Sequence, residues 1–81
     1  MTLEKEFYDK LLADFLSSAT NTNDHADRYD RNRNRVNYGS TIAYADILRR
    51  FGYDIDVPVY ESHGYLRIPS ITINGKKYKW E

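Results

Sequence analysis

The side chains best suited to chemistry are four arginines and three asparagines in the interval from residue 28 to residue 37. They are Arg28, Arg31, Arg33 and Arg35 with Asn32, Asn34 and Asn37, and Tyr29 and Tyr38 accompany them. Arginine forms bidentate hydrogen bonds with phosphate or guanine, and asparagine can pair with an adenine edge. Tyrosine offers a face on which a base can stack. The segment therefore favours contact with nucleic acid.

Two other interpretations of the same segment stay open. Arginines also suit an acidic protein surface, because the guanidinium pairs equally well with a carboxylate. They can also belong to a solvated helix face on which Asp24, Asp27 and Asp30 neutralise them.

Further basic side chains lie in two other places. Arg49 and Arg50 fall in the last turn of an expected helix, where they can reach phosphates or complement the helix dipole. Lys76, Lys77 and Lys79 belong to an expected hairpin. Lysines there can contact nucleic acid or protect a sheet edge from unwanted strand pairing.

Nothing in the chain is typical of a catalytic site. His25 and His63 are the two histidines, and the acidic residues near them lack a known metal-ligand spacing. No serine occupies a strained, glycine-flanked turn, and no glycine-rich phosphate loop occurs. We therefore predict no enzymatic activity, no bound metal and no cofactor.

Length and composition predict one domain over residues 1–81. The chain has 81 residues, no cysteine and a net charge of zero, from 12 basic and 12 acidic side chains. Any nucleic-acid surface must therefore arise from an uneven charge distribution. The lack of cysteine fits a cytoplasmic location. No apolar run approaches the roughly 18 residues that suggest a membrane span, so no membrane contact is expected.

The N-terminal half predicts one clear helix and one ambiguous segment. Leucines and phenylalanines at three- and four-residue spacing indicate a helix over residues 2–18, with Thr2 as its N-cap. Its apolar stripe favours core packing, and a homodimer seam is the alternative. Residues 19–25 are expected to form a loop, and Asn23 or Asp24 can cap a helix that starts after it. Residues 26–37 form either a helix, supported by an Asp27–Arg31 pair, or a basic loop.

A second helix is predicted over residues 40–51. Ser40 suits its N-cap and Gly52 the left-handed position after its end. Thr41 would then lie at the exposed start of the helix, where DNA-binding helices contact base edges. Tyr44 is expected to pack inward, because it shares a face with Ile47 and Phe51.

The remaining residues predict β-structure. Apolar and polar residues alternate over 55–59, which predicts a strand, 61–64 form a turn, and 65–68 form the returning strand. Residues 70–73 and 76–80 form a hairpin around Asn74-Gly75, a strong type I′ signal, with Ile71 opposite Tyr78. The fold class is therefore α+β, with two or three N-terminal helices followed by a small antiparallel sheet.

Residues 40–68 resemble the end of a winged helix-turn-helix domain, especially the N-terminal domain of biotin-operon repressors. The matching residues are Leu48, Arg49, Gly52, the alternating segment 54–57, and Gly64, Tyr65 and Leu66. The resemblance implies that the helix before Gly52 enters the major groove of DNA and that the following hairpin is the wing. Upstream, the chain is arginine- and asparagine-rich where the family has apolar residues, and residues 36–39 would supply the turn.

Two functions of different classes are consistent with these features. The first is a small, regulatory, winged-helix-like DNA-binding protein. The second is a non-catalytic inhibitor or adaptor of the kind that phages encode, such as an anti-defence or anti-CRISPR-like protein. It would bind an acidic or nucleic-acid-binding host protein through Tyr and Arg side chains, which dominate interface energetics.

Overall fold

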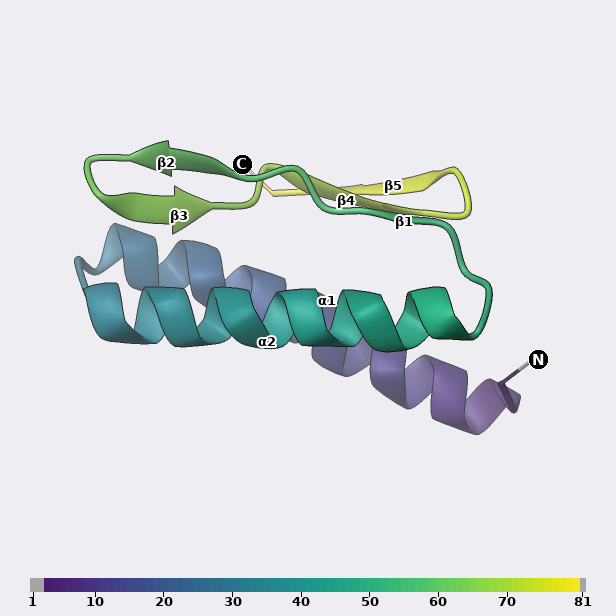
Figure 1. Cartoon of the computed structure of the whole chain (residues 1–81). Coiled ribbons are helices and arrows are strands. Elements are labelled where there is room, and N and C mark those ends of the chain that lie inside the picture. The colour runs from purple at the N-terminus through teal and green to yellow at the C-terminus, as the bar shows by residue number, and fades with distance from the viewer. Residues whose placement is uncertain (1–2, 81) are drawn as a thin grey trace.

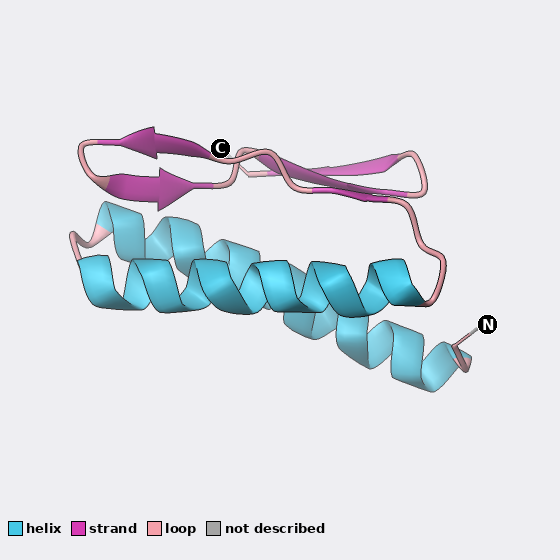
Figure 2. Cartoon of the chain, viewed as in Figure 1, coloured by secondary structure: helices cyan, strands magenta, loops and turns pink. Residues whose placement is uncertain are grey.

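The computed structural model describes residues 3–80 as two long helices followed by five short strands (Figure 1). The elements are α1 (Lys5–Asp27), α2 (Arg31–Arg50), β1 (Ile55–Asp56), β2 (Tyr60–Ser62), β3 (Tyr65–Arg67), β4 (Ser70–Ile73) and β5 (Lys76–Lys79). Figure 2 shows the helices as one layer and the strands as a second layer across them. The fold is thus α+β, as the sequence predicted.

Helix α1 is longer than predicted, because it continues through Ser18 and the whole segment 19–25. The predicted loop is therefore wrong, and neither Asn23 nor Asp24 caps a helix. The Ser18 hydroxyl donates to the Phe15 carbonyl at 2.7 Å, and the Thr22 hydroxyl donates to the Ser18 carbonyl at 2.8 Å. Both side chains are buried, so hydroxyls that suggested a loop are satisfied within the helix. The predicted N-cap Thr2 lies outside the described residues.

Helix α2 begins at Arg31, nine residues before the predicted start at Ser40. Asp30 is its N-cap, and the Asp30 carboxylate accepts from the Arg33 backbone N–H at 3.1 Å. The turn expected at residues 36–39 is wrong, because these residues lie inside the helix. Packing against α1 and the strands overrides the weak local signals of Gly39 and Ser40. The segment 26–37 thus divides into the end of α1, a short connection and the start of α2.

The C-terminal hairpin forms in the predicted register. Ile71 pairs with Tyr78 and Ser70 with Lys79, around a turn whose Asn74 and Gly75 both have positive φ, 48° and 86°. The expected hairpin of 55–59 with 65–68 is wrong. β1, at the start of the first expected strand, pairs with β4. β3 pairs instead with β2, which includes Glu61 and Ser62 of the expected turn, around a two-residue turn. Pro58, which lacks a backbone donor, lies in the break between β1 and β2.

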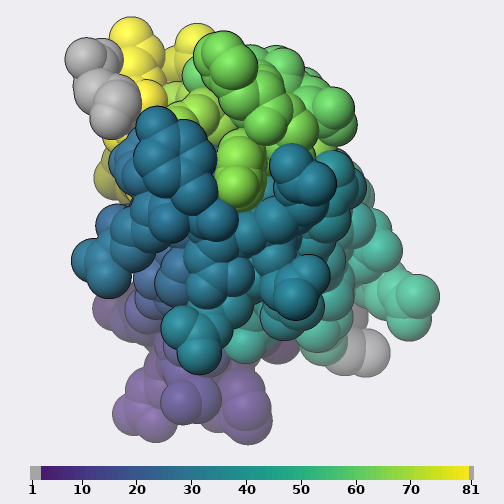
Figure 3. All heavy atoms as spheres, turned by 90° about the vertical axis from the view of Figure 1, so that its left-hand side faces the viewer, coloured from purple at the N-terminus to yellow at the C-terminus, as the bar shows by residue number. Residues whose placement is uncertain are grey.

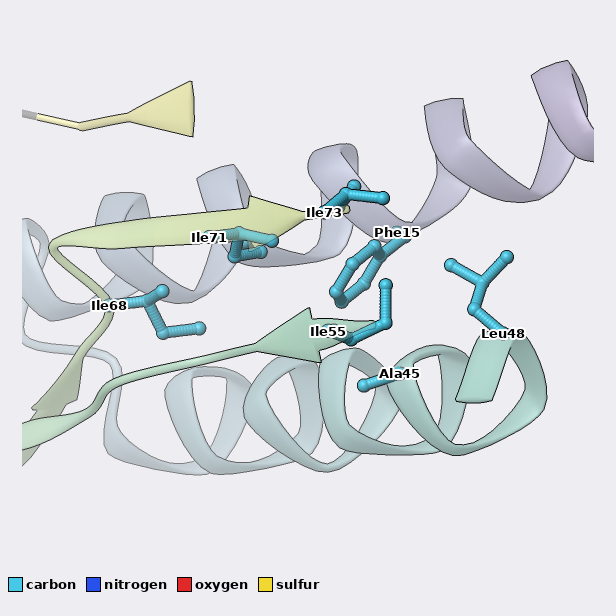
Figure 4. Packing of buried hydrophobic residues seen from close by; sticks show 8 residues of the cluster. Phe15, Ala45, Leu48, Ile55, Ile68, Ile71 and Ile73 are labelled. Carbon is cyan, nitrogen blue, oxygen red and sulfur yellow. The ribbon is translucent and has the colours of Figure 1, made fainter. Parts of the chain in front are cut away.

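The hydrophobic core lies between the helix layer and the strands (Figure 4). Phe15 of α1 and Leu48 of α2 meet isoleucines from the strands, and each of these two side chains is fully buried. The apolar stripe of α1 is therefore core packing, as predicted, and Tyr44 also packs against the core. Phe7 is the exception, since it is 63% exposed. A homodimer through this helix stays a prediction.

The helix pair followed by a small sheet leaves the winged-helix relationship a prediction. Residues 40–51, the expected recognition helix, form the second half of α2 and its end. Across residues 3–80, neither helix has the length and apolar character needed to cross a membrane.

Candidate functional site

The molecule has two ends that are built from similar parts (Figure 1). The arginine end combines the α1–α2 connection, residues 28–30, with the β2–β3 turn at His63-Gly64. The asparagine end combines the α2–β1 connection, residues 51–54, with the β4–β5 turn at Asn74-Gly75. Helix α2 runs between them, and its 20 residues span roughly 30 Å.

The predicted binding residues divide between these two ends. Arg28, Arg31, Arg33 and Arg35 lie at the arginine end, whereas Arg49, Arg50, Lys76 and Lys77 lie toward the asparagine end and Lys79 lies further along β5. The structure therefore brings the arginine run together with the β2–β3 hairpin and not with the lysines.

Most arginines at the arginine end have an acidic neighbour. The pairs are Arg28–Asp24 at 3.2 Å, Arg33–Asp30 at 3.8 Å, Arg35–Glu61 at 3.9 Å and Arg67–Asp27 at 2.8 Å. The predicted pair of Asp27 with Arg31 is wrong, because the two lie on opposite sides of the helix connection. Exposed pairs of this kind contribute about 0–1 kcal/mol, so a ligand can compete for these arginines.

Arg31 differs from its neighbours because no carboxylate of residues 3–80 forms an ion pair with it. Its guanidinium carbon lies 5.4 Å from the centre of the Tyr65 ring, a cation–π arrangement. It also rests against Gly64, where an added Cβ would come within 2.9 Å of a guanidinium nitrogen of Arg31. The guanidinium is thus held beside the hairpin while its charge stays available.

Two asparagines anchor the β2–β3 hairpin to the helices, a role that the sequence did not suggest. The Asn34 amide, fully buried, donates to the Thr22 and Leu66 carbonyls at 2.7 and 2.8 Å and accepts from the Leu66 N–H at 2.9 Å. The Asn23 amide donates to the Ile68 carbonyl at 2.9 Å and accepts from the Ile68 N–H at 2.8 Å. Asn34 is therefore structural and not a base-reading side chain.

A hollow with a volume of about 410 Å³ opens at the arginine end. Tyr29, Arg31, His63, Tyr65 and Arg67 contribute to its lining. Figure 3 faces this end, where residues of the α1–α2 connection and the start of α2, in blue, lie against the green β2–β3 hairpin. The rings of Tyr29 and Tyr65 meet edge-on, with centroids 5.9 Å apart. Aromatic faces and two guanidinium groups therefore border one opening.

Two of these lining residues have a left-handed backbone. Tyr29 has φ 58° and His63 has φ 55°, values that non-glycine side chains adopt at a cost of roughly 1–2 kcal/mol. The Tyr29 N–H donates to the Ala26 carbonyl at 3.2 Å, and the Tyr65 hydroxyl donates to the Tyr29 carbonyl at 3.0 Å. These bonds hold the Tyr29 backbone while its side chain projects outward, 78% exposed. Sequence reasoning noticed Tyr29 but had no signal for Tyr65, His63 or Arg67 beside it.

Two of the predicted site residues, Thr41 and Tyr38, belong to the framework of the fold, and a third, Asn37, bonds within its own helix. Thr41 lies in the middle of α2, fully buried, and its hydroxyl lies 2.9 Å from that of Ser18, so its predicted place at an exposed helix start is wrong. Tyr38 packs against the core. The Asn37 amide donates to the Arg33 carbonyl at 2.8 Å, within its own helix.

The predicted basic residues at the other end differ in how they are held. Two guanidinium nitrogens of Arg49 donate to the Ile55 carbonyl, at 3.0 and 3.3 Å, which ties the end of α2 to β1. Arg50 is exposed. The Lys76 ammonium lies 5.2 Å from the centre of the Tyr78 ring, and Lys77 and Lys79 are exposed on β5.

In the part of the chain that the structure describes, no three histidine or acidic side chains gather to form a metal site. The chain matches no protein-family model, no curated protein and no solved structure at significant similarity. The physical features of the arginine end are therefore what a functional proposal must use.

Proposed function

We propose that the protein binds nucleic acid in the cytoplasm through its arginine end, as a small regulatory protein without a catalytic step. The observation that carries this proposal is the start of α2. Arg31, Arg33 and Arg35 occupy three of its first five positions, and its first turn contains no acidic residue.

This arrangement opposes the usual electrostatics of a helix. The N-terminal end of a helix carries a partial positive charge, which favours acidic side chains and disfavours cations. Among residues 3–80, the N-cap Asp30 is the one carboxylate that accepts a backbone hydrogen bond at the helix start. Local choices that work against folding are expected mainly at functional sites. A phosphate group would satisfy both the arginines and the helix dipole, which supports a polyanionic ligand.

The test is fluorescence anisotropy with labelled 20-nucleotide DNA, as duplex and as single strand, at about 50 and about 200 mM salt. We expect wild-type affinity to fall steeply with salt. The variant R28S/R33S removes two exposed arginines, and the logarithmic salt slope should fall by about 0.7–0.9 for each phosphate that these arginines neutralise. Within the described residues the ion pairs of both arginines are exposed, so the variant should fold normally.

The matched control is R50S/K77S, which changes the net charge equally at the asparagine end. Arg50 lies in the last turn of the expected recognition helix, so this control also tests the winged-helix mode at that helix. We expect the control to bind as the wild type does. A loss confined to R50S/K77S would favour the winged-helix mode, and no binding of any oligonucleotide at low salt would refute the proposal.

Binding to a protein is the second candidate, and the ion pairs at the arginine end favour it. Five arginines there, residues 28, 31, 33, 35 and 67, face four acidic side chains, residues 24, 27, 30 and 61, so the local excess is one positive charge. Exposed Tyr29 beside arginines also has the composition of an interface hot spot. Two results together would favour this candidate. The first is nucleic-acid binding that R28S/R33S barely changes. The second is a nanomolar complex with one purified protein that R28S/R33S weakens.

A further inference from the structure

We propose that the hollow at the arginine end holds one unstacked base together with its phosphate, so that the protein prefers single-stranded to duplex nucleic acid. This inference rests on the proposed function and adds the form of nucleic acid that the site selects.

The size and lining of the hollow suit one nucleotide. Its volume of about 410 Å³ lies within the range of small-ligand pockets, about 300–1,000 Å³. Tyr29 as a residue is 78% exposed, so its ring is accessible for stacking with a base. Tyr65 meets it edge-on at 5.9 Å and forms a second aromatic wall. A base inside a duplex is already stacked on both faces, so this contact requires an unpaired base.

The charged groups of the hollow suit the phosphate. Arg31 lies over the Tyr65 ring at 5.4 Å and has no ion pair within residues 3–80. Arg67, on β3, lines the same opening and pairs with Asp27 at 2.8 Å through one nitrogen. A guanidinium group has five donors, so Arg67 can keep this pair and also bond a phosphate oxygen.

The backbone gives an independent reason to regard the hollow as a site. The left-handed residues other than glycine that the structure describes are Tyr29, His63 and Asn74. Asparagine and histidine are enriched in that conformation, but tyrosine is not. Tyr29, the unfavourable residue, lines the hollow. Strained residues cluster where function requires a particular side chain, and the ring of Tyr29 is too exposed to serve the core.

Because both hydrogen bonds that hold Tyr29 involve its backbone, a variant can remove the side chain and keep both bonds. The Tyr29 N–H and carbonyl are the bonded groups, and glycine would keep both. Glycine also adopts a positive φ without strain. The variant Y29G should therefore fold at least as stably as the wild type while it lacks the stacking face. Y60S is the matched control, because Tyr60 is also exposed, at 52%, but does not line this hollow.

The experiment measures the affinities of wild type, Y29G and Y60S for a labelled 20-nucleotide DNA strand, the RNA strand of the same sequence, and the DNA duplex. We expect the wild type to bind single strands more tightly than duplex, and Y29G to lose on the order of tenfold for single strands, with a smaller change for duplex. Y60S should bind as the wild type does. The relative affinity for the DNA and RNA strands then identifies which is the natural source of the nucleotide.

Failure of this inference and failure of the proposed function would give different results. Equal affinity for single strands and duplex, or an unchanged single-strand affinity in Y29G, would overturn the inference and leave nucleic-acid binding in place. No binding of the wild type to any of the three probes would overturn the proposed function and this inference together.

Discussion

The two ends of the molecule have the same backbone conformations at the helix end and the hairpin turn, but different residues adopt them. Each helix ends in the same hydrogen-bond pattern, in which the first residue past the C-cap is left-handed. At the arginine end, the Tyr29 N–H bonds the Ala26 carbonyl at 3.2 Å and the Asp30 N–H bonds the His25 carbonyl at 2.9 Å. This is a Schellman motif, which usually has glycine at the position that Tyr29 occupies.

The asparagine end repeats this motif with the favoured residue. The Gly52 N–H bonds the Arg49 carbonyl at 2.9 Å, and the Tyr53 N–H bonds the Leu48 carbonyl at 3.2 Å. Gly52 has φ 93°, a conformation that costs glycine little. The same backbone conformation thus ends both helices, with glycine in α2 and with tyrosine in α1.

The two hairpin turns show the same contrast. Asn74-Gly75 has φ values of 48° and 86°, and His63-Gly64 has φ values of 55° and 86°. Asn-Gly is a preferred dipeptide for such a turn, whereas His-Gly is not among the preferred ones, although histidine tolerates a positive φ. Asn74 also joins the turn to the α2–β1 connection, because its side-chain oxygen accepts from the Asp54 N–H at 2.8 Å. Among the described residues, the His63 side chain hydrogen-bonds only the hydroxyl of its neighbour Ser62, at 3.1 Å.

Each end also has a tyrosine pair. Tyr8 and Tyr53 stack with centroids 4.9 Å apart and pack against the core, whereas Tyr29 and Tyr65 meet edge-on at 5.9 Å beside the open hollow. The residues at the asparagine end are therefore those that local rules favour, whereas Tyr29 at the arginine end is not. This contrast supports our proposal that the binding site lies at the arginine end.

The largest expected effect comes from the anchor of the arginine end. N34A would remove three hydrogen bonds, among them both bonds that the Asn34 side chain forms with the half-buried Leu66 backbone. We expect a loss of about 3 kcal/mol in the free energy of unfolding, measured by urea denaturation. The control N32A, at an exposed position of the same helix, should change stability by about 0.5 kcal/mol or less. Equal effects of the two variants would show that Asn34 does not anchor the hairpin.

Exchanging the turn residues tests the contrast directly. N74H should destabilise the protein by about 1–2 kcal/mol, because it loses the bond to the Asp54 N–H. H63N should stabilise it by about 0.5 kcal/mol, because Asn-Gly is a preferred dipeptide for a two-residue hairpin turn. Thermal melting measures both, since 1 kcal/mol shifts Tm by about 4–8 °C in a chain of this size. Destabilisation by both substitutions would mean that His63 suits its turn as well as Asn74 does.

A smaller effect is expected at the asparagine end at high pH. Burial, then Tyr78, Tyr53 and Asp9, raise the pKa of Tyr8 above its ordinary value of 10.0. Because the folded pKa is the higher one, this contribution to stability is complete below about pH 10 and is lost as the pH rises through the folded pKa. Urea denaturation between about pH 8 and 11 should therefore show a shallower decline in Y8F than in the wild type. Identical declines would exclude Tyr8 as a source of the pH dependence.

Patterns that act over a few residues were predictable from the sequence. The Asn74-Gly75 turn, the register of β4 with β5 and the left-handed Gly52 all follow from local rules, and all three are present. Helix boundaries were not predictable, because contacts between α1 and α2 decide them. Buried Ser18, Thr22 and Thr41 look like loop or cap residues until the partner helix satisfies or covers them.

The candidate site was predictable only in part. The arginine run is visible in the sequence, but Arg67 and Tyr65 come from a strand more than 30 positions away, as the Tyr65–Tyr29 bond shows. Local rules point away from a left-handed Tyr29, because glycine is the residue they expect there. The failure of a local rule at Tyr29 is therefore one of the observations that support the proposed site.

The most direct test is to measure stability and single-strand affinity together in the double variant Y29G/H63N. If the arginine end trades folding stability for binding, Tm should rise by about 4–8 °C while affinity for a single-stranded 20-mer falls on the order of tenfold. A double variant with a lower Tm than the wild type, or with a higher Tm and unchanged affinity, would contradict this trade.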